Sequence, residues 1–412
     1  MNRASLRVLH FADAHIDIAN YGRHDPETAL PVRVMDFLRS LDQIIDRAVS
    51  EPVDLVIFAG DAYKDRNPQP TFQREWGNRM MRLSEAGIPT ILLVGNHDTA
   101  PSAGRANTLQ EYKTLAVPHI RVADTIDILT PDQLGIPIQV ITIPWISRSA
   151  IMTREEAAGK SLEDIHRFIE ERVAIKIHQL IDAAQTDLPL ILTAHSNVQG
   201  ARYGSERSVM LGQELMLGGT VVNNKRIDYV ALGHIHKHQS INEDRHPPII
   251  YPGSIERIDF GEARETKGFV LADVNLGESH WQFVKLNTRP FLDFSVTTDS
   301  AETFMPDIFQ SLPSPEKLAG TICRVQLRYP RDWEPLVDEA AINEHFREAH
   351  SLQIMKIRDT GDRSRLGDTL SVETLNPEEL LDQYWQNIGL EQEEAGVMQQ
   401  LARDILFGRP ED

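Results

Sequence analysis

Five short segments of this 412-residue chain carry aspartates, histidines and one asparagine, side chains that commonly bind metals or move protons. Each segment follows an apolar run rich in Val, Ile and Leu, which predicts a buried strand. The segments are Asp13-Ala14-His15, Gly60-Asp61, Gly95-Asn96-His97-Asp98, His195 and Gly233-His234-Ile235-His236. Because parallel strands deliver their loops to one edge of a sheet, we expect these side chains to meet there.

Together the segments supply enough oxygen and nitrogen ligands for two metal ions. A short carboxylate such as Asp61 can give one oxygen to each ion of a binuclear pair. Asp13 and His15 are two residues apart, so they project from the same side of an extended strand end, and His234 and His236 repeat this spacing. Mixed imidazole and carboxylate ligands favour Mn, Fe or Zn, and the lack of thiolate disfavours a structural zinc site. The pattern therefore predicts a two-metal phosphoesterase.

Each fragment alone has an ordinary structural interpretation. A single His-x-His is common, and Gly95-Asn96-His97-Asp98 could be a simple turn, because Gly, Asn and Asp favour turns. The combination, order and strand context favour the metal interpretation. The other histidines lack ligand spacing and fall in the first strand, as His10 does, or in loops and helices.

The motif series Asp-x-His, Gly-Asp, Gly-Asn-His-Asp, a lone His and Gly-His-x-His resembles the calcineurin-like metallophosphoesterases. Finer detail is similar to the SbcD-type DNA repair exonucleases, the nuclease components of SbcC–SbcD complexes. The resemblance covers most of the chain and is strongest up to about residue 275. The stretches that carry it are His10–His15, Tyr203–Arg207, Asp228–Lys237, Tyr251–Ser254, Gly261-Glu262 and Lys267–Phe269.

The resemblance implies a role for each motif residue. One metal would be held by Asp13, His15, Asp61 and His236, and the other by Asp61, Asn96, His195 and His234. His97 would be a catalytic acid, since an imidazole beside the leaving oxygen can donate a proton near neutral pH. Asp98 would either orient that ring or only stabilise the turn.

The resemblance also implies an activity. The expected reaction is Mn-dependent hydrolysis of DNA phosphodiesters by two metal ions, as a double-strand exonuclease and single-strand endonuclease. The expected setting is the processing of double-strand breaks or hairpins during DNA repair, recombination and replication. The expected partners are DNA, an SbcC-type ATPase and a second copy of the chain, as a homodimer within a heterotetramer.

Charge makes this assignment less simple. The net charge is −19, whereas phosphate binding normally shows as a basic face. Residues 366–412 hold eleven acidic and two basic side chains and so contribute −9 of that total. Asp17 stands where the resembled family often has glycine, and its carboxylate could bond a ligand or repel DNA. The basic side chains near the motif loops are candidate phosphate contacts or ordinary solvated residues: Lys64, Arg66, Arg105, Arg202, Arg207 and Lys237.

The remaining composition predicts a cytoplasmic protein. The single cysteine, Cys323, excludes an internal disulfide and fits a reducing compartment. The N-terminus runs almost directly into a strand at Leu6, which leaves no room for a signal peptide. No apolar run approaches the length of a membrane span.

Strand and helix patterns alternate over the first 270 residues, which predicts an α/β fold with helices on both faces of the sheet. Apolar residues from Val34 to Ala48 follow helical spacing, and Ser161 with Asp164 resembles a capping box that opens a long helix. With the resemblance, we expect a metallophosphoesterase sandwich of mixed β-sheets flanked by helices in residues 1–288. A small α/β capping domain is expected in residues 289–360.

Residues 361–412 are predicted to be a polar linker and two amphipathic helices, the first opening at Asn376-Pro377. These helices either pack back on the capping domain or, as the resemblance implies, dock on the coiled coil of an SbcC-type ATPase. The predicted docking residues are Leu380, Leu381, Tyr384, Trp385, Ile388, Val397, Met398, Leu401 and Ile405.

Two other functions share the same ligand motifs. The first is a phosphodiesterase that acts on a small nucleotide or a phosphoprotein, although neither substrate explains a capping region or a docking tail. The second is a non-catalytic tethering protein, which would have no need for a proton donor such as His97.

Overall fold

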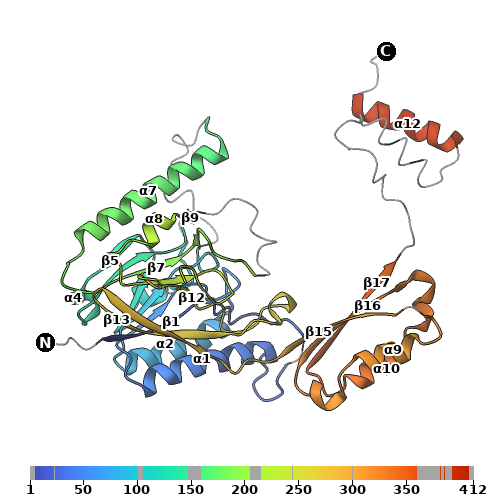
Figure 1. The fold of residues 1–412 in the computed structure, drawn as a ribbon, viewed down its shortest axis with the longest axis horizontal. Coiled ribbons are helices and arrows are strands. Elements are labelled where there is room, and N and C mark those ends of the chain that lie inside the picture. The colour runs from blue at the N-terminus through green and yellow to red at the C-terminus, as the bar shows by residue number, and fades with distance from the viewer. Residues whose placement is uncertain are drawn as a thin grey trace. The chain divides into compact units, whose positions relative to one another are not determined.

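In the computed structural model the chain divides into two compact units (Figure 1). The first comprises Met1–Asp293, Leu318–Arg324 and Glu348–Leu352, and the second comprises Phe294–Lys317, Val325–Arg347 and Gln353–Asp412. The residues that the structure describes are 5–22, 24–100, 105–146, 159–204, 215–243, 245–298, 300–359, 381, 385 and 392–407.

The first unit contains two six-stranded mixed sheets. The first sheet has the strand order β14 (Glu278–Lys285), β13 (Gly268–Asn275), β1 (Leu6–Phe11), β2 (Leu55–Phe58), β3 (Thr90–Leu93) and β4 (Ile120–Ala123). The second has the order β11 (Gln239–Ser240), β12 (Ile249–Tyr251), β10 (Tyr229–Gly233), β7 (Leu190–His195), β6 (Gln139–Ile143) and β5 (Asp127–Leu129). The strands β1 to β4 are parallel, as are β12, β10, β7 and β6. Antiparallel strands lie at the margins of both sheets.

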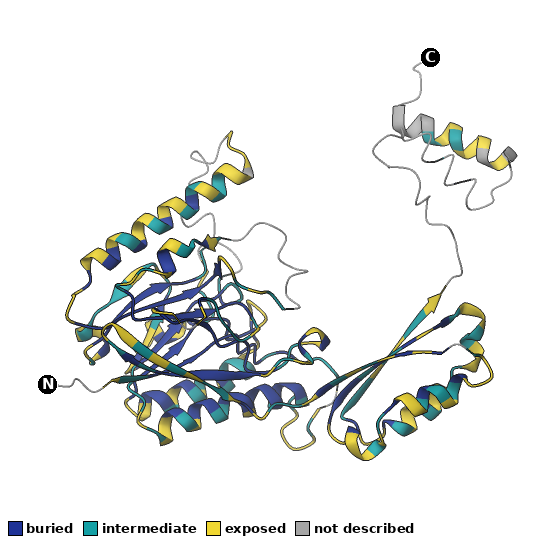
Figure 2. Cartoon of the chain, viewed as in Figure 1, coloured by how far each residue is buried: buried dark blue, intermediate teal, exposed yellow. Residues whose placement is uncertain are grey.

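Helices cover the outer faces of both sheets, so this unit has four layers (Figure 1). The helices α1 (Val32–Ser50) and α2 (Pro70–Glu85) pack on the first sheet. The helices α7 (Leu162–Ala183) and α8 (Gly219–Val222) pack on the second. The strands are mostly buried, whereas α7 exposes its outer side (Figure 2). The predicted sandwich of mixed sheets flanked by helices is therefore confirmed.

Alternation along the strands explains why both faces of each sheet are apolar. In β1, Leu9 and Phe11 face the layer of α1 and α2, and Val8 faces the second sheet. Between the sheets, the buried imidazole of His10 contacts the Tyr229 hydroxyl at 3.0 Å and the Leu232 carbonyl at 3.1 Å. His10 thus ties β1 to β10, the two strands that precede the first and last ligand motifs.

Local sequence signals are confirmed in two helices. All seven apolar residues that mark the predicted face of α1 are buried: Val34, Phe37, Leu38, Leu41, Ile44, Ile45 and Ala48. At the start of α7, the amide of Asp164 donates to the Ser161 hydroxyl, as the capping signal predicts.

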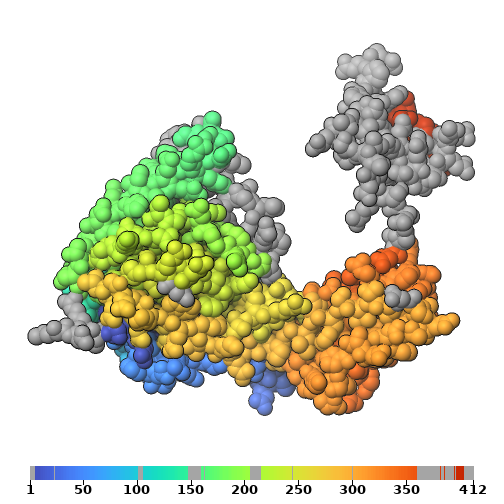
Figure 3. Space-filling model, viewed as in Figure 1, coloured from blue at the N-terminus to red at the C-terminus, as the bar shows by residue number. Residues whose placement is uncertain are grey.

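Shorter elements complete the first unit: α3 (Gln110–Thr114), α4 (Pro131–Leu134), β8 (Asn197–Val198), β9 (Met216–Leu217) and a 3₁₀ turn, η2 (Phe260–Glu262). Segments distant in sequence lie side by side, since β13 pairs with β1 near the N-terminus (Figure 3).

A three-stranded sheet of β15 (Phe291–Thr297), β16 (Ile322–Pro330) and β17 (Ser351–Asp359) contributes most of its residues to the second unit. That unit also contains α9 (Phe304–Ser311), α10 (Glu339–His345) and two 3₁₀ turns, η3 (Pro315–Leu318) and η4 (Arg331–Leu336), of which η3 ends at the border with the first unit. Within the described part of the chain, no helix is both long and apolar enough to cross a membrane.

The tail contains the helix α12 (Gln392–Phe407). Its Val397, Met398 and Leu401 are exposed. Of the predicted helix before it, the structure describes Leu381 and the buried Trp385, both helical. The predicted docking residues Leu380, Tyr384 and Ile388 lie outside the described residues, as does the start at Asn376-Pro377.

Candidate active site

The predicted ligands lie where parallel strands end. Asp13 and His15 follow β1, Asp61 follows β2, Asn96 follows β3, His195 closes β7, and His234 with His236 follow β10. These strands are central in their sheets. Their carboxyl ends therefore bring loops from both sheets to one place.

Backbone conformation in these loops is unusual. Positive φ angles occur at Asp13 (51°), His15 (40°), Asp61 (66°) and His234 (98°). Such conformations cost about 1–3 kcal/mol each in residues other than glycine and persist only where their surroundings hold them. Backbone hydrogen bonds hold them here: the amide of Asp13 donates to the Gly60 carbonyl, and the amide of His15 donates to the Asp61 carbonyl.

Close approach explains the glycines of two motifs. A Cβ atom at Gly60, whose φ is +100°, would lie 2.3 Å from Nδ1 of His195. A Cβ atom at Gly233 would lie 2.0 Å from the carbonyl oxygen of Ala59. Both positions therefore exclude a side chain because the ligand loops pack against them.

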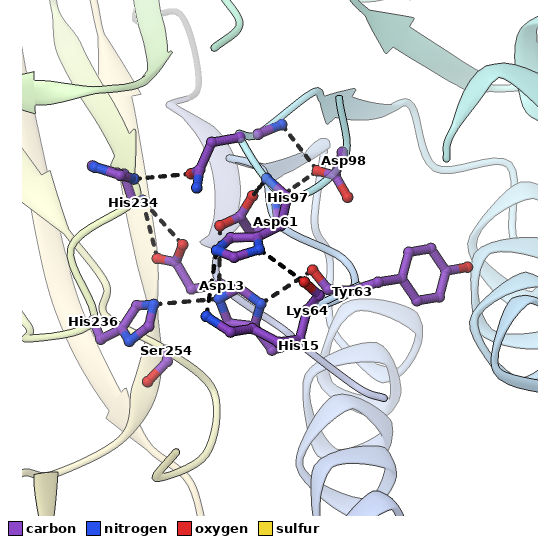
Figure 4. A network of polar contacts seen from close by, with 12 residues as sticks. Asp13, His15, Asp61, Tyr63, Lys64, His97, Asp98, His234, His236 and Ser254 are labelled. Atoms are coloured by element: carbon purple, nitrogen blue, oxygen red, sulfur yellow. Dashed lines mark hydrogen bonds and ion pairs between the residues drawn. The ribbon is translucent and has the colours of Figure 1, made fainter. Parts of the chain in front are cut away.

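The structure brings all seven predicted ligands together, and Figure 4 shows Asp13, His15, Asp61 and His236 pointing toward one another. Among the described residues, two groups of three side chains have ligand atoms that all lie within 4.8 Å of one another. One group is Asp13, His15 and His236, and the other is Asp13, Asp61 and His195.

Asp61 connects these groups, and Asn96 links His195 to His234. Oδ2 of Asp61 lies 3.7 Å from Nε2 of His15 and 3.4 Å from Nε2 of His195, a suitable position for a shared ligand. Oδ1 of Asn96 lies 2.9 Å from Nε2 of His195 and 3.1 Å from Nδ1 of His234.

Three imidazoles are oriented by their other nitrogen. Nδ1 of His15 contacts the Tyr63 carbonyl at 3.2 Å, and Nδ1 of His195 contacts the Ala59 carbonyl at 2.6 Å. Nδ1 of His236 contacts the Glu262 carboxylate at 2.9 Å. Since carbonyl and carboxylate oxygens accept, each Nδ1 carries the proton and donates it, and each Nε2 keeps its lone pair for the site.

This donor set fits divalent metal ions. Nε2 of His15 and Nε2 of His236 are 3.3 Å apart. Two neutral imidazoles in this arrangement face each other with their lone pairs, and a cation beside both nitrogens relieves that repulsion. The buried carboxylates of Asp13 and Asp61 supply the matching negative charge.

The pKa values of His195, Asp13 and Asp61 reflect burial and the close approach of imidazoles and carboxylates. Burial opposes charge on His195, but the carboxylates of Asp61 and Asp13 outweigh this effect and raise the pKa to about 9. Burial raises the pKa of Asp13, whereas the neighbouring His195 and His15 overcome burial and hold the pKa of Asp61 well below its usual range.

His97 lies beside the ligands without joining their set. Its amide donates to Oδ1 of Asp61 at 2.9 Å, and its Nδ1 donates to the Lys64 carbonyl at 2.8 Å. Its Nε2 lies 3.4 Å from Nζ of Lys64. Burial lowers the pKa of His97, Asp61 opposes this shift, and Lys64 adds to it. Nε2 of His97 is therefore the ring nitrogen left to exchange a proton beside the ligand cluster (Figure 4).

Asp98 has a different environment. Its carboxylate accepts hydrogen bonds from the amides of Asp61 (2.7 Å), Ala62 (3.0 Å) and Gly95 (2.9 Å), and from the Thr108 hydroxyl (3.1 Å). The His97 ring is instead held by the Lys64 carbonyl. Of the two roles predicted for Asp98, these contacts favour stabilisation of the turn.

Asp17 also binds backbone. Its carboxylate accepts from the amides of Lys64 at 2.5 Å and Asp65 at 2.9 Å. It therefore fixes the loop that follows Asp61.

Several neighbours of the site have no role predicted from the sequence. Glu262 and Lys267 are both 1% exposed and form an ion pair of 2.8 Å directly behind His236. In the sequence they stand out only as parts of the Gly261-Glu262 and Lys267–Phe269 stretches that carry the resemblance. The Trp145 ring lies 5.0 Å from that of His234 between centroids. Its signal in the sequence is its place after β6, another parallel strand of the second sheet.

The predicted phosphate contacts are spread over several loops. Lys64 and Arg66 are exposed and line a cleft that also includes His97. Gln239 donates to the carbonyls of Arg202 (2.8 Å) and Lys237 (3.3 Å), which places those two residues close together. Arg105 is exposed, and Arg207 lies outside the described residues.

Comparison with known proteins agrees with this geometry. Residues 6–238 match the calcineurin-like phosphoesterase family. This chain belongs to that family. It is therefore a hydrolase of phosphate esters with the candidate ligands of a dinuclear metal site.

Individual relatives are more distant. The chain is 26% identical over 311 residues to the SbcD component of nuclease SbcCD from Bacillus subtilis (strain 168), covering 73% of this chain and 74% of the relative. It is 27% identical over 283 residues to the uncharacterized metallophosphoesterase YhaO of the same organism, covering 68% and 60%. It is 26% identical over 280 residues to the SbcD component of nuclease SbcCD from Escherichia coli (strain K12), covering 66% of each chain. The chain thus spans 60% to 74% of the length of these three relatives.

Proposed function

We propose that this chain is a DNA nuclease that uses two divalent metal ions, Mn²⁺ above all, to hydrolyse phosphodiesters at ends and in single strands. The observation that carries the proposal is the convergence of the seven predicted ligand side chains beside His97. The nuclease names of two relatives support DNA as the substrate.

The residues divide between two metal positions. Asp13, His15, Asp61 and His236 would hold one ion, and Asp61, Asn96, His195 and His234 would hold the other. When bound, the two ions would neutralise phosphate charge and acidify a water molecule. Asp61 would be the shared ligand, since its Oδ2 lies within 4 Å of imidazoles from both groups.

The protein's own residues supply orientation and a proton. His97 donates through Nδ1 to the Lys64 carbonyl, which leaves Nε2 to deliver a proton to the departing sugar oxygen. Asp98 holds the backbone of the Asp61 and Gly95 loops through three amides. Glu262 fixes the His236 ring, and Lys267 balances the charge of Glu262.

We also propose how the rest of the chain serves this activity. Residues 289–360 would cap the DNA channel, and residues 361–412 would dock on an SbcC-type ATPase. The exposed apolar residues of α12 support the docking role. The working assembly would be a homodimer within a heterotetramer that processes double-strand breaks and hairpins in the cytoplasm.

The test is cleavage of end-labelled linear duplex DNA by the purified chain with added Mn²⁺, compared with an aryl phosphodiester. His97→Ala should abolish DNA cleavage and retain bound metal, measured by elemental analysis. His280→Ala is the matched control, since this side chain is exposed on β14 and remote from the ligand motifs.

Three outcomes decide between assignments. DNA shortening that disappears in the His97 variant supports a nuclease with His97 as its acid. Loss of metal from that variant would instead make His97 a ligand. Turnover of the aryl ester with intact DNA would contradict the nuclease assignment for the isolated chain and favour a small-molecule phosphodiesterase.

A further inference from the structure

A cleft of about 1230 Å³ opens beside His97 in the first unit. Residues 17–20, 24 and 29–31 contribute to its walls, together with residues 64–69 and the first turn of α2. Among the predicted site residues, His97, Lys64 and Arg66 line this cleft, whereas none of the seven predicted metal ligands does. The cleft therefore adjoins the candidate acid and is a space separate from the ligand cluster.

The position of His97 indicates which part of the substrate would lie in the cleft. A general acid must lie within hydrogen-bond reach of the oxygen that leaves. In this site, that oxygen must therefore depart next to Nε2 of His97. The part of the substrate attached to it must occupy space on the His97 side of the scissile phosphate, and the cleft is a space that His97 lines.

The cleft wall presents two exposed basic side chains to a phosphate. Lys64 and Arg66 are exposed there, and neither forms an ion pair with a carboxylate of the described residues. The acidic neighbours are engaged by backbone: Asp17 accepts from the amides of Lys64 and Asp65, and Asp65 accepts from the amide of Asn67 at 2.9 Å. The loop thus presents its basic side chains without a paired acid, despite the net charge of −19 for the whole chain.

The cleft also has apolar and polar groups that suit a nucleotide. Ile18, Leu30 and Phe72 line it, and Phe72 is half-buried because it also packs against the core. Asn67 and Gln69 add hydrogen-bonding groups to the same lining. A surface that combines a basic loop with an aromatic side chain is typical of single-strand nucleic acid sites.

We propose that this cleft binds the nucleotide on the departing side of the scissile phosphate, with Arg66 contacting the next phosphate and Phe72 facing the base. This inference rests on the proposed nuclease function and names the part of the substrate that the cleft receives. Arg66 is a specificity residue in this arrangement, because it contacts a phosphate that the departing group has only when it is a nucleic acid strand. A substrate whose departing group is a simple phenol does not use this contact.

The test neutralises one phosphate and one arginine in turn. The cut in a short single strand is first mapped, and the departing side is identified as the product that ends in a hydroxyl group. Two further oligonucleotides then carry a neutral methylphosphonate at the next linkage, one on the departing side and one on the retained side. Each is cleaved by wild type, Arg66→Ala, Arg66→Lys and Arg245→Ala, the last being an exposed arginine outside the cleft lining.

We expect the departing-side methylphosphonate to raise the KM of wild type about tenfold, the value of one charge-assisted phosphate contact. Arg66→Ala should raise the KM of the unmodified strand by a similar factor and lose sensitivity to that methylphosphonate. Arg66→Lys should recover part of the sensitivity, and Arg245→Ala should match wild type. The retained-side methylphosphonate should affect wild type and Arg66→Ala equally. Arg66→Ala should reduce the turnover of an aryl diester by a smaller factor than it reduces cleavage of the unmodified strand.

A binding measurement gives a readout that needs no turnover. With EDTA present, fluorescence anisotropy of a labelled oligonucleotide should show a salt dependence whose slope is lower by about 1 in Arg66→Ala than in wild type. Equal slopes, together with equal sensitivity to the departing-side methylphosphonate, would overturn the cleft assignment and leave the nuclease proposal intact. Wild type that cleaves an aryl diester and no oligonucleotide would overturn both proposals.

Discussion

The ligand loops of the first unit and the helix α12 of the second unit differ in how far contacts within the chain bury their side chains. Asp13, Asp61 and His195 are buried, and their loops are fixed by hydrogen bonds between segments far apart in sequence. Val397 and Leu401 of α12 are 61% and 51% exposed. A buried geometry that several hydrogen bonds fix suits chemistry that the chain performs alone. An exposed apolar face suits a surface that binds another molecule.

The largest effect on the ligand loops should come from Asp61→Asn. This change keeps the size of the side chain and removes the carboxylate that lies near imidazoles of both groups. We expect phosphodiester turnover to fall by about 1000-fold, or roughly 4 kcal/mol of transition-state stabilisation. Steady-state kinetics with Mn²⁺ and metal analysis are the measurements.

Asp132→Asn is the matched control, because Asp132 is exposed in the first turn of α4. Full activity in the Asp61 variant would show that the shared carboxylate is dispensable.

A smaller effect is expected from Glu262→Gln, which changes the support of a ligand and keeps all seven ligands. Glutamine can still accept from His236, but the buried Lys267 loses one of its two carboxylate partners. We expect a loss of stability of about 3 kcal/mol from the broken pair and a fall in metal affinity of about 10–100-fold. Calorimetry of unfolding and metal titration are the measurements.

Glu278→Gln is the control for that change, since this glutamate is 75% exposed on β14. If Glu262→Gln and Glu278→Gln have the same stability and the same metal affinity, the ion pair of Glu262 and Lys267 does not stabilise the site.

Much of this arrangement follows from local sequence. The strand before each motif and the apolar face of α1 are visible as short-range patterns, so the fold class and the meeting of the motif residues could be predicted. The N-cap of α7 is also local, since Ser161 and Asp164 are three residues apart.

Other features depend on contacts that no local pattern encodes. Glu262 lies 26 residues from His236 in sequence, and its support of that ring depends on how the η2 turn packs. The interaction of Asp98 with the amides of Asp61 and Ala62 crosses 37 and 36 residues. The Lys64 carbonyl that holds the His97 ring is a backbone group, so its residue type carries no signal. The positive φ angles of the ligand loops result from the same tertiary packing.

A pH-dependent effect should come from His10, which lies between the sheets and away from the ligand set. Burial lowers the pKa of His10 to about 3, below its ordinary value of 6.5. Its contribution to stability is therefore complete above pH 6.5 and is lost as the pH falls toward 3, because the unfolded chain takes up the proton first. Wild type should lose up to about 1.4 kcal/mol for each pH unit below 6.5 through this group.

His10→Phe removes this titration. At pH 7.5 the variant should be less stable by about 1–3 kcal/mol, because the Leu232 carbonyl and the Tyr229 hydroxyl lose their partner. The difference in the free energy of unfolding between this variant and wild type should become smaller as the pH falls. Urea unfolding at several pH values measures it. His280→Phe, at an exposed position, is the control for replacing a histidine with phenylalanine. A difference for His10→Phe that does not change with pH would contradict the burial effect.

The smallest effect on the chain's own chemistry should come from the tail, and this prediction tests the comparison most directly. Deletion of residues 376–412, or the single change Leu401→Asp, should leave Mn²⁺-dependent turnover of an aryl diester unchanged, because the ligand loops are built from the first unit alone. Leu401 is exposed, so the point variant should also keep the stability of wild type within about 0.5 kcal/mol. Both variants should lose association with an SbcC-type ATPase in a pull-down, with Gln400→Asp on the same helix as a control for added charge. Retained association would assign the exposed face of α12 to another role, and lost turnover would show that the tail takes part in the active site.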